Sequence, residues 1–213
     1  MSERKLEGLE PQSVFHYFEE ICAIPHGSRN TKAISDYLVA FAKAHNLTCR
    51  QDESNNVVIF APGTCGLEDH APVILQGHMD MVCEKDASCT LDMAVDGLDV
   101  THDDQFVFAR GTTLGGDDGI AVAYALAILA DNTIAHPPLE VIITVDEEIG
   151  MLGAAAMVDG MLDRLEDALG MPVTAVATGG LAGCVIPHCR RHIILDDALL
   201  LRGLAVMYSR ETH

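Results

Sequence analysis

Apolar residues recur along the chain with two spacings, and these spacings predict alternating helices and strands. Three segments carry apolar side chains on one stripe or on all sides, as helices do: residues 13–24, 30–46 and 118–130. Short runs rich in β-branched residues are predicted as strands: residues 48–51, 56–60, 73–76, 106–109 and 139–145. This alternation predicts an α/β fold with a mostly parallel sheet and helices on both faces.

Some of these segments carry more specific expectations. Residues 139–145 form a continuous β-branched run, which is typical of a central strand covered on both faces. Residues 73–76 are predicted as a short buried strand. Residues 118–130 are apolar all round, so this helix should be deeply buried. Residues 83–104 are polar and irregular, and they are predicted as a surface excursion.

A second unit is predicted from about residue 154, which divides the chain into residues 1–153 and 154–213. Most of the formal net charge of −19 lies before this point. The second unit should begin with an amphipathic helix over 157–169, whose apolar stripe is Met157, Met161, Leu165 and Leu169. A strand over 173–177, a tight turn and a last helix over 199–208 should follow.

The composition of the 213-residue chain restricts its partners. A net charge of −19 argues against nucleic acid and anionic membranes as partners. The seven cysteines have no framework spacing, so we expect reduced thiols in a cytoplasmic protein. The first residues contain no apolar leader-like run, and no apolar stretch is long enough to predict a membrane span.

Candidate chemistry lies in three clusters, each of which follows a predicted strand. They are His78-Met79-Asp80, the loop GTTLGGDDG at 111–119, and Glu147-Glu148. Each cluster alone has a simpler interpretation: a histidine packed in the core, a glycine-rich loop with capping aspartates, and a solvated strand end. Strands of an open α/β sheet gather their carboxyl ends at one edge, so the three clusters together predict a metal site there.

The residue types suit such a site. His78 offers a neutral imidazole and the carboxylates offer hard oxygen ligands. Asp80 can accept the other imidazole N–H of His78 and fix its orientation. Asp117 has two oxygens and could bridge two ions. Adjacent glutamates at a strand end should point apart, so one of Glu147 and Glu148 can bind metal while the other acts as general base.

Three segments resemble the cytosolic aminoacyl-histidine dipeptidases, also called Xaa-His or non-specific dipeptidases. They are GHMDMVCEK (77–85), ARGTTLGGDDGIAVAYALAIL (109–129) and PLEVIITVDEEIGMLGA (138–154), and the resemblance covers about residues 8–154. These enzymes belong to the two-metal peptidases that include aminoacylases and glutamate carboxypeptidases. The resemblance implies hydrolysis of small dipeptides with two ions of Zn²⁺, or of Mn²⁺ or Co²⁺.

The resemblance also implies a role for each candidate residue. His78 would bind one ion, Asp117 would bridge both, and Glu148 would bind the second. Asp80 would orient His78, and Glu147 would be the general base.

The sequence departs from this family in two places. Where the family has a further carboxylate ligand, residues 169–172 read Leu-Gly-Met-Pro. The family's last histidine ligand and its inserted lid and dimerisation domain have no counterpart here. Each ion would then keep two protein ligands, so we expect impaired hydrolysis. The alternative is an inactive remnant with weak metal or nucleotide binding, and the oligomeric state stays open.

The tail resembles a different family, the type III pantothenate kinases. The segments are AAMVDGMLDRLEDALGMPVTAVATGGLA (155–182) and LDDALLLRGLAVMYSRE (195–211), which suggests a chimera of two truncated parts. In the kinases the corresponding turn belongs to an ATP-binding fold, which implies a weak nucleotide site at Thr178, Gly179 and Gly180. The kinase motif DxGNT does not occur in this chain.

The tail could interact with the first unit in two ways. Its helix and strand could continue the dipeptidase sheet, because both families place a helix and then a strand here. It also offers residues of metal-ligating type, which we expect instead to be ordinary surface or core residues: Asp159, Asp163, Cys184, His188 and His192.

Overall fold

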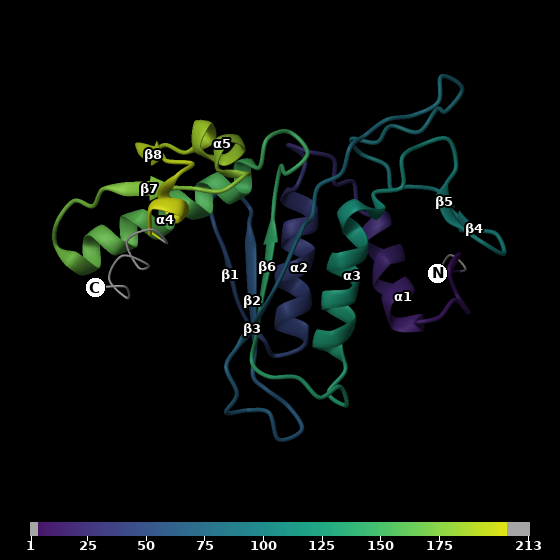
Figure 1. Ribbon diagram of the computed structural model, residues 1–213. Helices are drawn as coiled ribbons and strands as arrows, with labels where there is room; N and C mark the ends of the chain where they lie inside the picture. Colours follow the sequence, from purple (N-terminus) through teal and green to yellow (C-terminus); the bar gives the residue numbers. More distant parts are fainter. Residues whose placement is uncertain (1–3, 204–213) are drawn as a thin grey trace. The chain divides into compact units, whose positions relative to one another are not determined.

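A four-stranded sheet organises the first part of the computed structural model, which describes residues 4–203 (Figure 1). Its strands, in spatial order, are β1 (Thr48–Gln51), β2 (Val57–Ala61), β6 (Leu139–Thr144) and β3 (Val73–His78). The β1–β2 and β2–β6 pairs are antiparallel, and only β3–β6 is parallel. The α/β class is confirmed, but the prediction of a mostly parallel sheet is wrong. The short link between β1 and β2 permits only a hairpin, since parallel strands need long crossovers.

The residues that alternate onto one face of the sheet form the core. Val57 and Ile59 of β2 lie opposite Ile143 and Val141 of β6, and all four are buried. On the other face, side chains such as Phe60 are only partly buried. The helices of this unit therefore cover one face, and the prediction of helices on both faces is not met within it. The continuous β-branched run of β6 suggested two covered faces, but on one face its Ile142 is only partly buried.

Three helices close this core, and their bounds agree closely with the predicted segments. They are α1 (Gln12–Cys22), α2 (Lys32–Ala44) and α3 (Gly116–Ala130). Helix α2 packs on β1 and β2, α3 packs on β3, and α1 packs on α3 (Figure 1). Helix α3 is buried along most of its length as predicted, although Tyr124 is exposed.

Strand β3 is less buried than predicted because it forms an edge of the sheet. Val73 and Ile74 at its start are exposed. Gly77 and His78 at its end are buried. Burial therefore increases along β3 toward the end that carries the candidate histidine.

The segment before the glycine-rich loop forms a separate hairpin of β4 (Val100–His102) and β5 (Val107–Ala109). Strand β4 was not predicted, because it is short and lies in a polar segment. Strand β5 was predicted, but it does not join the four-stranded sheet. Asp117 is therefore placed by the loop and the start of α3, and not by the carboxyl end of a sheet strand.

The chain divides into two compact units between Glu148 and Ile149. The elements of the second unit are α4 (Leu152–Leu169), β7 (Ala175–Ala177), α5 (Ala182–Val185), a 3₁₀ turn η1 (Ile186–His188) and β8 (Ile193–Leu195). A helix starts at Leu199, as predicted, and the end predicted for it at Tyr208 lies outside the described residues. Strand β7 pairs with β8 in a parallel two-stranded sheet. Within residues 4–203, the tail strands therefore do not continue the four-stranded sheet, which the sequence had left open as a possibility.

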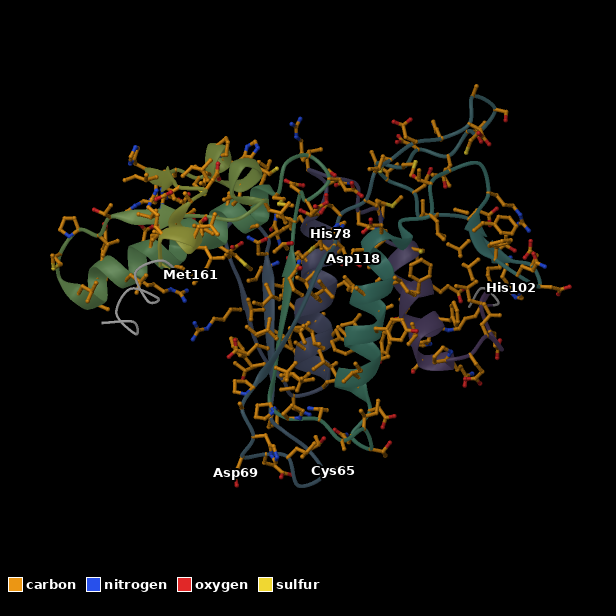
Figure 2. All side chains as sticks on the ribbon, viewed as in Figure 1. Cys65, Asp69, His78, His102, Asp118 and Met161 are labelled. Carbon is orange, nitrogen blue, oxygen red and sulfur yellow. The ribbon has the colours of Figure 1, made fainter. Side chains whose placement is uncertain are left out.

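The second unit buries few side chains. In α4 only Gly153, Ala155 and Asp159 are buried. Met161 and Leu165 of the predicted apolar stripe are 63% and 50% exposed, so this stripe does not form a core within the described residues (Figure 2). Among the helices of residues 4–203, none combines the length and the apolar character that a membrane crossing requires.

Candidate metal centre

The parallel pair β3–β6 brings two of the three clusters to one edge of the sheet. His78 lies opposite Thr144 in the register, so the two strands end together. The N–H of Met79 donates to the carbonyl of Thr144 at 2.9 Å and extends the pairing by one step. The chain after each strand therefore leaves the sheet at the same place, as the spacing of the clusters predicted.

A glycine lets the start of α3 approach β3. A Cβ on Gly77 would lie 2.8 Å from Oδ2 of Asp118 and 3.5 Å from Cβ of Ala121. This close approach allows the N–H of His78 to donate to Oδ2 of Asp118 at 3.3 Å. Asp118 thus ties the glycine-rich loop to the end of β3, a role that its position beside Asp117 did not indicate.

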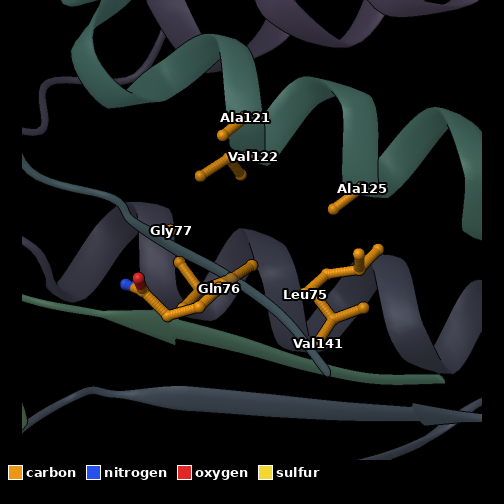
Figure 3. A pocket seen from close by; sticks show the side chains of 8 residues that line it. Leu75, Gln76, Gly77, Ala121, Val122, Ala125 and Val141 are labelled. Atoms are coloured by element: carbon orange, nitrogen blue, oxygen red, sulfur yellow. The ribbon is translucent and has the colours of Figure 1, made fainter. Parts of the chain in front are cut away.

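A small apolar space lies between α3, β3 and β6 (Figure 3). None of the residues that line it is titratable: Leu75, Gln76, Gly77, Ala121, Val122, Ala125, Val141 and Ile143. It is therefore a gap in side-chain packing and offers no ligands to a metal ion.

The glycine-rich loop turns sharply at Gly115, where φ is +71°. A Cβ there would lie 2.9 Å from Sδ of Met81 and 3.3 Å from Nε2 of His26, so only glycine fits. Asp117 follows with non-helical dihedral angles and an exposed side chain. Its Oδ1 lies 3.2 Å from Nε2 of His78.

His78, Asp117 and Glu148 each offer a ligand atom, and these atoms all lie within 4.8 Å of one another. Two ligands of one zinc ion, each bound at about 2 Å, lie roughly 3.5 Å apart. Nε2 of His78 and Oδ1 of Asp117, which lie 3.2 Å apart, already have about this spacing. The distances to Glu148 are at most 4.8 Å, and its exposed side chain can shorten them by rotation. One imidazole and two carboxylates also suit Zn²⁺ and Mn²⁺ chemically. The residues present therefore fit a divalent cation.

Asp80 lies behind His78 and is 1% exposed. The backbone oxygen of Asp80 is 3.0 Å from Nδ1 of His78, and its Oδ1 is 3.4 Å from the same atom. The N–H of Glu147 donates to Oδ1 at 3.0 Å, and that of Glu148 donates to Oδ2 at 3.4 Å. Asp80 therefore contacts the nitrogen of His78 that faces away from Asp117, and it also fixes the backbone of the glutamate pair.

The two glutamates do not point apart as predicted. Strand β6 ends at Thr144, and Asp146 has a left-handed backbone with φ of 56°. The alternation of a strand therefore no longer applies at Glu147 and Glu148. Oε2 of Glu147 lies 3.9 Å from Nε2 of His78, on the side where Glu148 also offers its ligand atom.

The clustered carboxylates shift the pKa values of the site. Burial alone would lower the pKa of His78, but the hydrogen bond and charge of Asp80, with Asp117 and Asp118, raise it to about 9. Burial and the neighbouring acids raise the pKa of Glu148. The site holds more negative charge than one imidazolium neutralises, so a bound cation would relieve it.

The buried Asp80 shifts in the other direction. Burial would raise its pKa, but hydrogen bonds from His78, Ser28 and the N–H of Glu147 outweigh burial and lower it. Asp80 is therefore held as a carboxylate, the form that accepts these bonds.

Other charged residues that could have neutralised the aspartates or bound metal have partners of their own. Arg110, the nearest arginine in sequence to the aspartates, lies 3.4 Å from Asp99. In the second unit Asp159 accepts the backbone N–H groups of Arg190 and Arg191 at 2.7 and 2.9 Å. Asp163 forms ion pairs with both arginines. Within residues 4–203, the only group of three or more His, Cys, Asp or Glu ligands close enough for a metal ion is His78, Asp117 and Glu148.

The three residues of the suggested nucleotide turn lie between β7 and α5. Gly179 has φ of +105°, which agrees with the predicted tight turn. Their binding of a nucleotide stays a prediction.

Sequence reasoning missed Ser28 and Asp146. Oγ of Ser28 donates to Oδ2 of Asp80 at 2.8 Å, and the N–H of Arg29 donates to Oδ1 of Asp146 at 2.6 Å. Neither residue lies in one of the three clusters, and no spacing along the chain links residues so far apart. Only the fold reveals them.

Comparisons with known proteins find two similarities, and the first covers most of the chain. The family model described as peptidase family M20/M25/M40 matches residues 74–187. The cytosol non-specific dipeptidase of Escherichia coli is 44% identical over 150 residues, which are 70% of this chain and 31% of that protein. The crystal structure of aminoacylhistidine dipeptidase from Vibrio alginolyticus superposes with a TM-score of 0.68 at 41% identity. It covers 70% of this chain and 30% of the other.

A second similarity involves a shorter part of the chain. The type III pantothenate kinase of Zymomonas mobilis is 36% identical over 59 residues, which are 28% of this chain and 22% of the kinase. The chain thus spans about a third of the dipeptidases that it matches, and less of this kinase. Similarity to both families, expected from the sequence, is confirmed.

Proposed function

Because the chain belongs to peptidase family M20/M25/M40, whose model matches more than half of it, we propose that its first unit is the metal-binding catalytic part of a dipeptide hydrolase. The observation that carries this proposal is the convergence of His78, Asp117 and Glu148 at the end of the β3–β6 pair. Three segments distant in sequence meet there, and each offers one potential ligand atom.

Two ions of Zn²⁺, or of Mn²⁺ or Co²⁺, would be held by these side chains. His78 would bind one ion through Nε2, Asp117 would bind both through its two oxygens, and Glu148 would bind the second. When bound, the ions supply the positive charge that polarises the scissile carbonyl. Binding requires the neutral imidazole, so metal uptake should release the proton that His78 holds in the metal-free protein.

Glu147 is the proposed general base. Its side chain is 35% exposed, so both water and a substrate can reach it. Its carboxylate would take a proton from the attacking water and pass it to the leaving amine. The hydrogen bond from the N–H of Glu147 to Asp80 fixes the backbone of Glu147. Its side chain can therefore change rotamer while the backbone stays in place.

The proposed substrates are small dipeptides of the Xaa-His type. Dipeptides follow from the names of both relatives that are over 40% identical to the chain, and the Xaa-His type follows from the name of the Vibrio alginolyticus enzyme. The cytoplasm is the proposed location, because the Escherichia coli relative is named a cytosol enzyme. We also propose that hydrolysis is slow, because two of the family's metal ligands have no counterpart here. The rate of dipeptide hydrolysis by the full chain tests this.

The test is hydrolysis of Gly-His and β-Ala-His by the full chain loaded with Zn²⁺ or Mn²⁺, with the released amine measured by chromatography. We expect turnover that a chelator abolishes. Glu147→Gln should keep its metal and lose about 10²–10⁴-fold in rate, the usual contribution of a general base. Glu53→Gln, at an exposed residue in another loop, is the matched control. A metal-loaded wild type that cleaves neither dipeptide would contradict the proposal.

A nucleotide role for Thr178, Gly179 and Gly180 is the alternative. It rests on the kinase similarity and on the turn after β7. If it holds, ATP should raise the melting temperature of the full chain, and Gly179→Val should remove the shift. An unchanged melting temperature at millimolar ATP would exclude it.

A further inference from the structure

We propose that Ser28 is a positioning residue of the metal centre, which it sets through Asp80. This inference rests on the proposed function, because it concerns the geometry of the same site. Ser28 belongs to the segment between α1 and α2, which contributes no proposed ligand and no proposed base.

The backbone of this segment is hydrogen-bonded to the residues that follow β3. Gly27 and Met81 form an isolated parallel bridge. The N–H of Met81 donates to the carbonyl of His26, and the N–H of Ser28 donates to the carbonyl of Met81, both at 3.2 Å. The backbone of Ser28 is therefore fixed next to Asp80 independently of its own side chain.

The hydroxyl of Ser28 donates one of the hydrogen bonds that hold the Asp80 carboxylate. It donates to Oδ2 at 2.8 Å, whereas the other donor to that oxygen, the N–H of Glu148, is at 3.4 Å. Oδ1 accepts the N–H of Glu147 and faces Nδ1 of His78. Without the hydroxyl, Oδ2 would keep only the longer bond. The carboxylate could then rotate and release both His78 and the glutamate backbone.

The neighbouring residue holds the same loop from its other side. The N–H of Arg29 donates to Oδ1 of Asp146 at 2.6 Å, and Asp146 directly precedes Glu147. Ser28 and Arg29 thus donate hydrogen bonds to Asp80 and Asp146, the two aspartates next to the glutamate pair. The bond from Arg29 uses the backbone, so a side-chain change at Ser28 removes one contact and leaves the other.

A positioning role differs measurably from a structural one. Loss of a single hydroxyl bond at a partly buried serine should leave the fold intact. Loss of a partner that orients a metal ligand usually lowers metal affinity by about 10–100-fold. The proposal therefore predicts a change in the site without a matching change in melting temperature.

The experiment compares three variants of the full chain: Ser28→Ala, Ser28→Thr, which keeps the hydroxyl, and Ser54→Ala at an exposed control serine. In the metal-free protein, Ser28→Ala should shift the backbone amide resonances of Glu147 and Glu148, and the other two variants should not. Titration with Zn²⁺ should show about 10–100-fold weaker binding for Ser28→Ala and near-normal binding for Ser28→Thr. All melting temperatures should stay close to that of the wild type.

Unchanged amide resonances, or unchanged zinc affinity, in Ser28→Ala would overturn the inference. So would an equal loss in Ser28→Ala and Ser28→Thr together with a lower melting temperature, because that pattern indicates a structural residue. A wild type that binds no metal would contradict the proposed function instead. The amides of the metal-free protein would then still show whether Ser28 holds Asp80 and the glutamate loop.

Discussion

A buried aspartate in each unit accepts two consecutive backbone N–H groups, and the surroundings give the two aspartates different roles. Asp159 accepts those of Arg190 and Arg191 at 2.7 and 2.9 Å. Asp80 accepts those of Glu147 and Glu148 at 3.0 and 3.4 Å. The local motif is the same, so the motif alone does not define a functional site.

The surroundings of the two aspartates differ in charge. The segment that Asp159 holds carries two arginines, which form ion pairs with Asp163 and Glu166. The segment that Asp80 holds carries two glutamates, beside Asp117 and the imidazole of His78. One cluster is balanced, whereas the other has an excess of negative charge that a cation could neutralise. Unbalanced charge next to a buried anchor is therefore the feature that marks the site.

The two units also differ in packing. A core of fully buried side chains from α1, α2, α3 and the sheet supports Asp80. Asp159 lies on a helix whose large apolar side chains are partly buried or, at Met161, Leu165 and Leu169, exposed. A rigid support suits a site in which ligand atoms must hold their geometry. This comparison leads to three predictions.

Removal of a core side chain should have the largest effect. Leu126 of α3 is 0% exposed, so Leu126→Ala should lower the free energy of unfolding by about 2–5 kcal/mol. Leu165 of α4 is 50% exposed, and Leu165→Ala should change it by less than about 0.5 kcal/mol. Urea denaturation followed by circular dichroism measures both. Equal losses would show that the stripe of α4 is packed in solution.

Neutralising Asp159 should have the next largest effect. Asp159→Asn presents an amide donor to N–H groups and weakens the link between α4 and the segment before β8. We expect local opening of the second unit to become easier by about 1–3 kcal/mol. Hydrogen exchange at the amides of Arg190 and Arg191 should accelerate accordingly. Asp167→Asn, at an exposed residue of the same helix, should leave these rates unchanged, and acceleration in both variants would refute the assignment.

Acid should reveal a smaller contribution within the first unit. Burial would raise the pKa of Glu20, but hydrogen bonds from Tyr37 and Arg4 and the charges of His16 and Arg4 lower it. Because the pKa of Glu20 in the folded state lies below the ordinary value of 4.5, ionised Glu20 contributes its full stabilisation at pH values above 4.5. The contribution is lost as pH falls through the folded-state pKa.

Comparison with Glu20→Gln isolates this contribution. The difference in unfolding free energy between wild type and variant should shrink as pH falls from about 5 to about 3. In a Tyr37→Phe background, Glu20→Gln should change the unfolding free energy by less, because the hydrogen bond from Tyr37 is already absent. A constant difference across this pH range would contradict the role given to Glu20.

Much of the first unit was predictable from its sequence. The helices and the central strand follow from apolar spacing. The three clusters that contain His78, Asp117 and Glu148 were found because each follows a strand-like run, whereas the choice of Glu148 over Glu147 as a ligand came from the resemblance to the dipeptidases. The short link between β1 and β2 already implied an antiparallel pair, but the direction of the β2–β6 pair was not predictable, because the two runs look the same whichever way they pair. The left-handed turn at Asp146 was also hidden, so the glutamates were expected to point apart.

The second unit shows why apolar spacing can mislead. Met161 and Leu165 have the spacing of a buried stripe but are exposed, whereas the buried side chains of that helix are those of Ala155 and Asp159. Spacing predicts which residues share a face, but burial also requires a partner for that face. Ser28 was missed for a related reason, since its contact with Asp80 joins segments that only the fold brings together.

The metal content of the purified full chain after dialysis tests the central claim most directly. Wild type should keep at least one Zn²⁺ or Mn²⁺ per chain, measured by mass spectrometry of the elements. Asp117→Asn and His78→Asn should lose it. Asp69→Asn, which changes an exposed loop distant from His78 (Figure 2), should keep it. Metal-free wild-type protein, or an Asp117→Asn variant that retains as much metal as the wild type, would contradict the account.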